Sequence, residues 1–173
     1  WQMTKTFEIQ TARPQHFEAI AALNIAAYRE FSKGLTDETW TRMRSNLSAI
    51  DKVSERAVFL IVPIDGKLAG SVAYCPPGNS LDPIPSDWAS ILLLAVSPDD
   101  RGDGIGRELV RACIDLARAD EAQTIGLFTS ELMTAARQLY LSQGFSEDCE
   151  ISQRLGLRYW RYRLDLNHPK STI

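Results

Sequence analysis

The sequence contains little cysteine and histidine. Of its 173 residues three are cysteine (Cys75, Cys113 and Cys149) and two are histidine, and no two cysteines form a C-x-x-C pair. This set offers too few ligands for a zinc site, so we expect no metal. A disulfide scaffold is also excluded, because a chain of this length buries about 70% of its surface on folding. We expect buried, reduced thiols and a reducing compartment, the cytoplasm.

The sequence also lacks an excess of positive charge and long apolar runs. Nineteen Lys and Arg stand against 22 Asp and Glu, a net charge of −3, so a dedicated nucleic-acid binder is not expected. The longest apolar runs, such as 91–96, have six residues, whereas a membrane-spanning helix needs about 20. The first residues have no basic and apolar regions of a signal peptide. We expect a soluble protein with neither nucleic acid nor membrane as partner.

Hydrophobic periodicity predicts strands alternating with helices in one domain covering residues 1–173. Strands are expected at 7–12, 57–63, 67–75, 88–97, 124–129 and 158–166, and helices at 17–28, 37–50, 103–119 and 131–142. The pair Asp65 and Gly66 is typical of a tight hairpin turn, and Thr36 is expected to cap the second helix. The pattern favours an α/β fold with helices packed on a central sheet.

The most informative segment is an apolar strand that runs through a glycine-rich loop directly into a helix. The loop reads R-G-D-G-I-G-R, with glycines at 102, 104 and 106. Glycines let the backbone approach a ligand closely, and the first turn of a helix offers unpaired N–H groups, so the segment predicts a phosphate site. It is neither a P-loop, which ends Gly-Lys-Ser/Thr, nor the G-x-G-x-x-G of dinucleotide-binding folds. NAD is therefore disfavoured.

Two motifs resemble the GNAT superfamily of acyl-CoA N-acyltransferases. The loop fits R-x-x-G-x-G, with Arg101, Gly104 and Gly106, and 136–145 fits A-x-x-L-Y-x-x-x-G-F. The resemblance implies a GNAT-like fold: a mixed, mostly antiparallel sheet of six to seven strands, helices on both faces, and splayed fourth and fifth strands. It also implies acetyl transfer from acetyl-CoA to a primary amine of a small molecule or protein, by direct attack in a ternary complex without a metal.

The resemblance also assigns residues to acetyl-CoA. The backbone of the fourth strand, at Leu94, Ala95 and Val96, would pair with the pantetheine arm. The Leu94 N–H would face the thioester carbonyl, where a donor stabilises the developing oxyanion. The pyrophosphate would lie on the backbone amides of a loop made of Arg101, Gly102, Asp103, Gly104, Ile105, Gly106 and Arg107. Asp103 is expected to point into solvent or to cap the helix.

The resemblance identifies the catalytic acid and base less directly than the acetyl-CoA site. Tyr140 stands where the family uses a tyrosine as general acid for the departing CoA thiolate. The alternative is a structural role, in which the tyrosine of an L-Y pair on an amphipathic helix packs in the hydrophobic core. The fourth strand contains no carboxylate, so Asp87 and Glu131 are the candidate bases, although each is better explained as a solvated or capping residue. Met133 stands where many family members carry an Asn that contacts CoA.

Residues of the acceptor side are proposed from their position near these motifs. They are Tyr28, Glu30, Phe31, Tyr74, Trp88 and Glu131, and the Pro-rich loop after Tyr74 is expected to border the site. Two other functions stay open. One is a GNAT-like module that binds CoA without turnover, and the other is an α/β nucleotide-binding protein unrelated to CoA. The resemblance also allows a homodimer.

Overall fold

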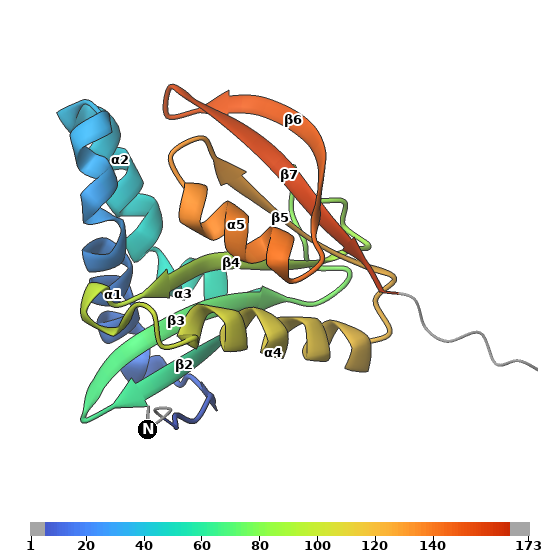
Figure 1. The fold of residues 1–173 in the computed structure, drawn as a ribbon, viewed down its shortest axis with the longest axis horizontal. Coiled ribbons are helices and arrows are strands. Elements are labelled where there is room, and N and C mark those ends of the chain that lie inside the picture. The colour runs from blue at the N-terminus through green and yellow to red at the C-terminus, as the bar shows by residue number, and fades with distance from the viewer. Residues whose placement is uncertain (1–5, 167–173) are drawn as a thin grey trace, which may run out of the picture.

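A seven-stranded mixed sheet forms the centre of the molecule (Figure 1). The computed structural model describes residues 6–166 of the chain. The strand order is β1-β2-β3-β4-β5-β7-β6, and every neighbouring pair is antiparallel except β4 and β5. The predicted fold, a mostly antiparallel sheet between helices, is confirmed.

The elements have the following bounds. The strands are β1 (Gln10–Thr11), β2 (Val58–Ile64), β3 (Lys67–Cys75), β4 (Ala89–Val96), β5 (Thr124–Ser130), β6 (Ser146–Arg154) and β7 (Leu157–Asp165). The helices are α1 (Phe17–Tyr28), α2 (Asp37–Ser48), α3 (Ile50–Ser54), α4 (Ile105–Ala119) and α5 (Thr134–Ser142). Three short 3-10 helices are η1 (Pro14–His16), η2 (Arg29–Gly34) and η3 (Pro98–Asp100).

Local chemistry explains where several elements begin and end. Asp65 and Gly66 have φ of 51° and 77°, as a two-residue hairpin turn requires, so the predicted turn between β2 and β3 is confirmed. The Thr36 hydroxyl accepts a hydrogen bond of 3.1 Å from the Thr39 N–H and caps α2 as predicted.

The helices cover the two faces of the sheet. On one face α1 buries Ile20 against Phe59 and Ala73 of the β2–β3 hairpin. On the other face α4 packs so closely on β3 that a Cβ added at Gly70 would lie 2.5 Å from Ile105 Cγ2. Helix α5 shares the core of α4 through Tyr140. The sheet therefore has an α1 face and an α4–α5 face.

Strands β4 and β5 pair at one end only. Ala89 and Ser90 face Ile125 and Gly126, and no register partners follow along the two strands. On its other side β4 shifts its register against β3, and Leu93 within this shift has a φ of 55°, which is rare for a residue other than glycine. The predicted splay of the fourth and fifth strands is confirmed, and it opens the sheet between them.

Some features differ from expectation. Strand β6 and the short helix α3 were not predicted, and the first strand is only two residues long. Cys75 and Cys113 are buried as expected, but Cys149 on β6 is exposed, because β6 is an edge strand with few buried side chains. Within residues 6–166 no helix is both long and apolar enough to cross a membrane.

Candidate functional site

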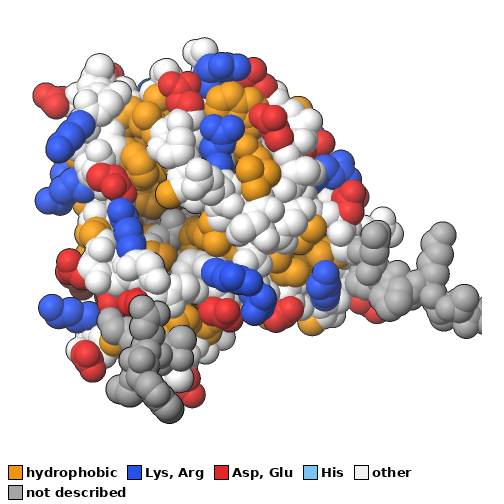
Figure 2. All heavy atoms as spheres, viewed as in Figure 1, with side chains coloured by type: hydrophobic (Ala, Val, Ile, Leu, Met, Phe, Trp, Pro, Cys, Tyr) orange, Lys and Arg blue, Asp and Glu red, His pale blue; other side chains and the backbone are white. Residues whose placement is uncertain are grey.

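A cleft of about 490 Å³ lies where β4 and β5 separate. In the view of Figure 1, Figure 2 shows a hollow left of centre with hydrophobic side chains along its walls. The cleft is lined by the end of α1 and by η2, the second half of β4, the glycine loop with the start of α4, and the N-terminal part of α5. The residues predicted for the site that line it are Tyr28, Glu30, Phe31, Leu94, Ala95, Val96, Arg101, Gly102, Gly104, Ile105, Gly106 and Arg107.

The glycine loop has the geometry of an anion cradle. Gly102 and Gly104 have φ of 90° and 81°, and a Cβ added at either would meet no atom within 4 Å, so both face open space. Gly104 stands at the N-cap of α4 and has no side chain of its own to cap it, and the first turn of the helix, from Ile105 to Arg107, lines the cleft. Asp103, between these two glycines, is exposed.

Arg101 connects the loop to α1. Its guanidinium donates a hydrogen bond of 3.0 Å to the carbonyl of Ala27 and forms an ion pair of 2.7 Å with Glu30. The side chain is thus already partnered by the wall of the cleft. Recognition of a phosphate here would depend mainly on the loop backbone and on the dipole of α4.

The edge of β4 is held by a tyrosine from α1. The Tyr28 hydroxyl donates a hydrogen bond of 2.9 Å to the carbonyl of Leu94, directly after the irregular Leu93. Burial of the hydroxyl raises the pKa of Tyr28 far above its ordinary value, so the group stays a donor. The sequence placed Tyr28 near the acceptor, but nothing in it indicated this bond to the strand that would face the thioester.

Tyr140 lies in the core between α5 and the sheet. It is 6% exposed, its ring meets Phe145 at 5.9 Å, and its neighbours Ala136 and Leu139 line the cleft while it does not. Burial raises the pKa of the phenol well above 10, and the nearby Tyr28 hydroxyl adds to the effect. The predicted end of the helix is confirmed, because Gly144 has a φ of 99°.

Three predicted residues lie away from the cleft, which corrects their expected position. Tyr74 is buried and its hydroxyl donates a 2.7 Å hydrogen bond to Asp120, just after α4. Trp88 packs on β5, where a Cβ at Gly126 would come within 2.7 Å of its ring. Glu131 accepts a hydrogen bond of 3.1 Å from the Arg158 backbone N–H. Sequence order alone could not show which end or face of the sheet these residues occupy.

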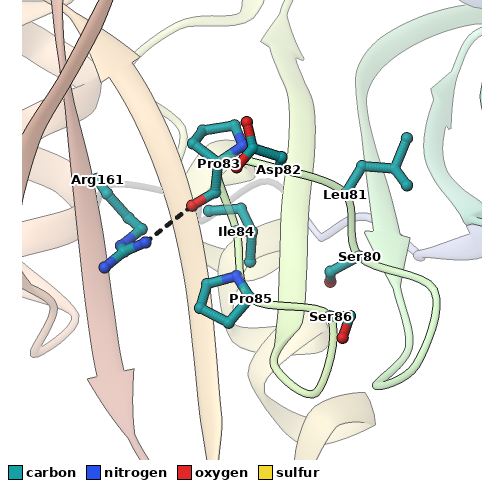
Figure 3. Close-up of a pocket in the computed structure, with 8 residues that line it drawn as sticks. All are labelled: Ser80, Leu81, Asp82, Pro83, Ile84, Pro85, Ser86 and Arg161. Atoms are coloured by element: carbon teal, nitrogen blue, oxygen red, sulfur yellow. Dashed lines mark hydrogen bonds between the residues drawn. The ribbon is translucent and has the colours of Figure 1, made fainter.

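The Pro-rich loop forms a pocket of its own. This pocket, about 330 Å³, is lined by residues 80–86 and by Arg161 of β7, and it shares no residue with the cleft. Figure 3 shows the Arg161 side chain reaching the loop, where it donates a 2.9 Å hydrogen bond to the Pro83 carbonyl. The expectation that this loop borders the site is therefore wrong: the loop lies away from the cleft.

The carboxylates of the cleft are not the expected ones. Glu30 and Asp100 line it, whereas the candidate bases Asp87 and Glu131 do not. Met133 does line the cleft, so this wall offers a thioether in place of an amide. Within the described part of the chain no three His, Cys, Asp or Glu side chains gather as metal ligands.

Comparison with known sequences gives one family and several relatives. The acetyltransferase (GNAT) family model matches residues 17–145. N-acetyltransferase 8F1 of Rattus norvegicus is 29% identical over 123 residues, 70% of this chain and 53% of that protein. The probable N-acetyltransferase camello of Xenopus tropicalis is 31% identical over 108 residues, 61% of this chain and 47% of that protein. The chain thus spans about half the length of these relatives.

Solved structures share the fold at low sequence identity. The paia N-acetyltransferase of Thermoplasma acidophilum, solved with coenzyme A, has a TM-score of 0.75 at 14% identity, covering 94% of this chain and all of that one. Salmonella typhimurium yncA, solved with acetyl-CoA, has a TM-score of 0.66 at 18% identity and covers 98% and 99%. The open sheet with its parted strands thus belongs to a fold seen with bound coenzyme A.

Proposed function

Because the chain belongs to the acetyltransferase (GNAT) family, we propose that it transfers an acetyl group from acetyl-CoA to a primary amine. The observation that carries the proposal is the cleft itself. It runs from an anion cradle at the start of α4, built from the R-x-x-G-x-G motif, to the edge of β4, and residues of the second motif, Ala136 and Leu139, line its wall. The relatives named above are N-acetyltransferases, which supports the same reaction.

The residues of the cleft fit acetyl-CoA. Gly102 and Gly104 leave open space beside the first turn of α4, where backbone N–H groups would hold the pyrophosphate. The edge of β4 at Leu94 to Val96 lies in the cleft wall and would pair with the pantetheine arm. When bound, acetyl-CoA supplies the acetyl group as a thioester. The chain has to position that thioester, favour loss of a proton from the amine and supply a proton to the departing thiolate.

The first proton belongs to the amine. An alkylamine with a pKa near 10.4 loses its proton at pH 7 at a cost of about 4 to 5 kcal/mol, unless the site lowers that pKa. The cleft wall is largely apolar around Phe31, Leu132 and Leu139, and Glu30 is occupied by Arg101. Desolvation in such a cleft favours the neutral amine, so we propose that it replaces a dedicated carboxylate base on β4.

The second proton goes to the leaving group. The amine nitrogen forms a bond to the acetyl carbon and loses a second proton, the carbon–sulfur bond breaks, and the thiolate takes a proton. The Leu94 N–H would stabilise the negative charge that develops on the thioester oxygen. Tyr140 would donate this proton: its raised pKa means that the phenol is protonated at the start of the reaction, and the proton lost by the nitrogen would restore it afterwards.

The first experiment is calorimetric titration of the protein with acetyl-CoA, followed by measurement of CoA release with a panel of primary amines. Binding and amine-dependent CoA release are expected. Binding without release from any amine would support the alternative, a CoA-binding module without turnover. No binding at millimolar acetyl-CoA would refute both.

A matched pair of glycine variants tests the cradle. Gly104→Ala and Gly66→Ala place the same methyl group at φ of 81° and 77°, both into open space, but only Gly104 lies in the cleft. Each should lose roughly 1 kcal/mol of folding stability from the left-handed backbone. Gly104→Ala should in addition weaken acetyl-CoA binding about tenfold, since its methyl group stands where the phosphate would approach. Equal affinities in the two variants would show that the cradle is elsewhere.

A further inference from the structure

The acceptor amine has to reach the thioester from the α1 face of the sheet. The glycine loop and the starts of α4 and α5 bound the cleft on the α4–α5 face, which acetyl-CoA would occupy under the proposed function. The opening between β4 and β5 leads to the opposite face, where η2 meets the turn after β5. A Cβ at Gly34 would lie 3.8 Å from Leu132 of that turn. Beyond this contact the α1 face of β5, β7 and β6 continues outward.

This face carries a row of aromatic rings, each covered by arginines. Trp88 lies under Arg161 and Arg163, whose guanidinium carbons are 5.0 and 4.7 Å from the ring centroid. Phe128 of β5 lies under Arg154, the last residue of β6, at 4.8 Å. Phe128 faces Arg161 in the β5–β7 register, so both groups stand on the same face.

The arginines of this row differ in their charge partners. Arg161 pairs with Asp148 at 2.6 Å and Arg163 with Asp165 at 2.8 Å. Arg154 is exposed, and among residues 6–166 no carboxylate forms an ion pair with it. Its guanidinium lies over a ring, and its N–H groups are the donors that would meet an anion.

A chain of contacts joins Arg154 to the edge of β4. The Phe128 ring meets Tyr159 of β7 at 6.2 Å. Tyr159 faces Ser130 at the end of β5, and the turn that follows β5 places Leu132 in the cleft wall together with Tyr28. Tyr28 donates to the Leu94 carbonyl. In Figure 1 the β6–β7 turn, which follows Arg154, extends toward α2.

From this arrangement we propose that the acceptor is a primary amine that also carries a carboxylate, and that Arg154 binds this carboxylate while Phe128 and Tyr159 contact the body of the acceptor. The inference rests on the proposed function and specifies its acceptor. A guanidinium meets a carboxylate through two parallel N–H donors, so Arg154 would fix the far end of the acceptor and leave the amine toward Leu94. The aromatic rings favour an apolar spacer between the two ends.

The test compares amines that differ only at the far end. Suitable pairs are 4-(aminomethyl)benzoate with its carboxamide and 6-aminohexanoate with its carboxamide, because the carboxylate is far enough from the amine to leave its basicity nearly unchanged. We expect kcat/KM for at least one carboxylate to exceed that of its amide about tenfold, the size of one hydrogen-bonded charge pair at a partly exposed site. Arg154→Gln should abolish this preference, and Arg154→Lys should keep part of it.

Arg158→Gln is the matched control. Arg158 is also exposed on the β6–β7 hairpin, but it pairs with Glu150 at 2.8 Å and stacks on Trp160. The variant removes the same charge and should keep the preference for the carboxylate. An equal kcat/KM for both members of each pair, or a preference that survives Arg154→Gln, would overturn the inference.

A binding experiment separates this inference from the proposed function. The N-acetylated forms of the same pairs are titrated into the protein with CoA present, and their affinities are compared for wild type and Arg154→Gln. If no amine releases CoA but the acetylated carboxylate binds about tenfold tighter than the amide through Arg154, turnover fails and the anion site stands. If amines are acetylated but the affinities are equal, the anion site fails and the proposed function stands.

Discussion

Removing the hydroxyl of Tyr140 should slow acetyl transfer without weakening the fold. The side chain is 6% exposed and packs against Phe145, contacts that Tyr140→Phe keeps. Within residues 6–166 no group hydrogen-bonds to the hydroxyl, so the substitution leaves no hydrogen-bond partner unsatisfied. If the phenol donates the proton to the thiolate, kcat should fall about a hundredfold, about 2.7 kcal/mol in activation free energy.

Tyr74→Phe supplies the opposite result and is the control. Tyr74 is buried like Tyr140, but its hydroxyl donates a hydrogen bond to Asp120 away from the cleft. Losing this bond should cost about 1 kcal/mol, or about 2 to 4 °C in Tm for a chain of this size, and leave kcat unchanged. One buried tyrosine should thus affect the rate and the other the stability.

Three measurements distinguish these outcomes. Thermal unfolding gives the change in Tm, calorimetry gives the acetyl-CoA affinity, and CoA release at saturating amine gives kcat. Acetyl-CoA affinity should stay within about twofold for Tyr140→Phe, since general-acid catalysis acts in the transition state. A wild-type kcat in Tyr140→Phe would refute the proton-donor role. A fall in kcat matched by an equal loss of acetyl-CoA affinity would assign the hydroxyl to binding instead.

Three further substitutions test the surroundings of the cleft. Tyr28→Phe removes the hydrogen bond to the Leu94 carbonyl, so kcat should fall about tenfold while acetyl-CoA affinity changes less, as steady-state rates and calorimetry would show. Gly126→Ala places a Cβ 2.7 Å from the Trp88 ring and should cost about 1 to 3 kcal/mol in unfolding free energy with unchanged acetyl-CoA affinity. Thr36→Ala should lose about 1 kcal/mol in denaturant unfolding through its lost helix cap.

The parts of the fold that depend on local chemistry could be predicted from the sequence. The hairpin at Asp65 and Gly66, the cap at Thr36 and the left-handed Gly144 each require a particular residue type at one position. The glycine loop is of the same kind, because Gly102 and Gly104 adopt backbone angles that other residues rarely take. A single sequence is enough to find such positions.

Features set by distant contacts could not be predicted in this way. Strand β6 reads S-E-D-C-E-I-S-Q-R and has few apolar residues, because it is a sheet edge held by pairing with β7. Its sequence therefore lacks the alternation that marks a half-buried strand. Tyr74 and Trp88 belong to the predicted elements, but their distance from the cleft follows from strand order and from which side chains share a face. Strand order and shared faces are properties of the assembled sheet, so one short segment of sequence does not reveal them.

The irregularity of β4 helps to create the site, but the sequence contains no pattern that predicts it. The segment reads I-L-L-L-A-V, and nothing marks Leu93 for a φ of 55°. A left-handed leucine costs roughly 1 to 3 kcal/mol and persists only where its surroundings impose it. Here the register shift against β3, the loss of pairing with β5 and the Tyr28 hydrogen bond to Leu94 together impose it. The same three features leave the edge of β4 in the cleft. The strain at Leu93 and the opening for acetyl-CoA therefore arise from the same local arrangement.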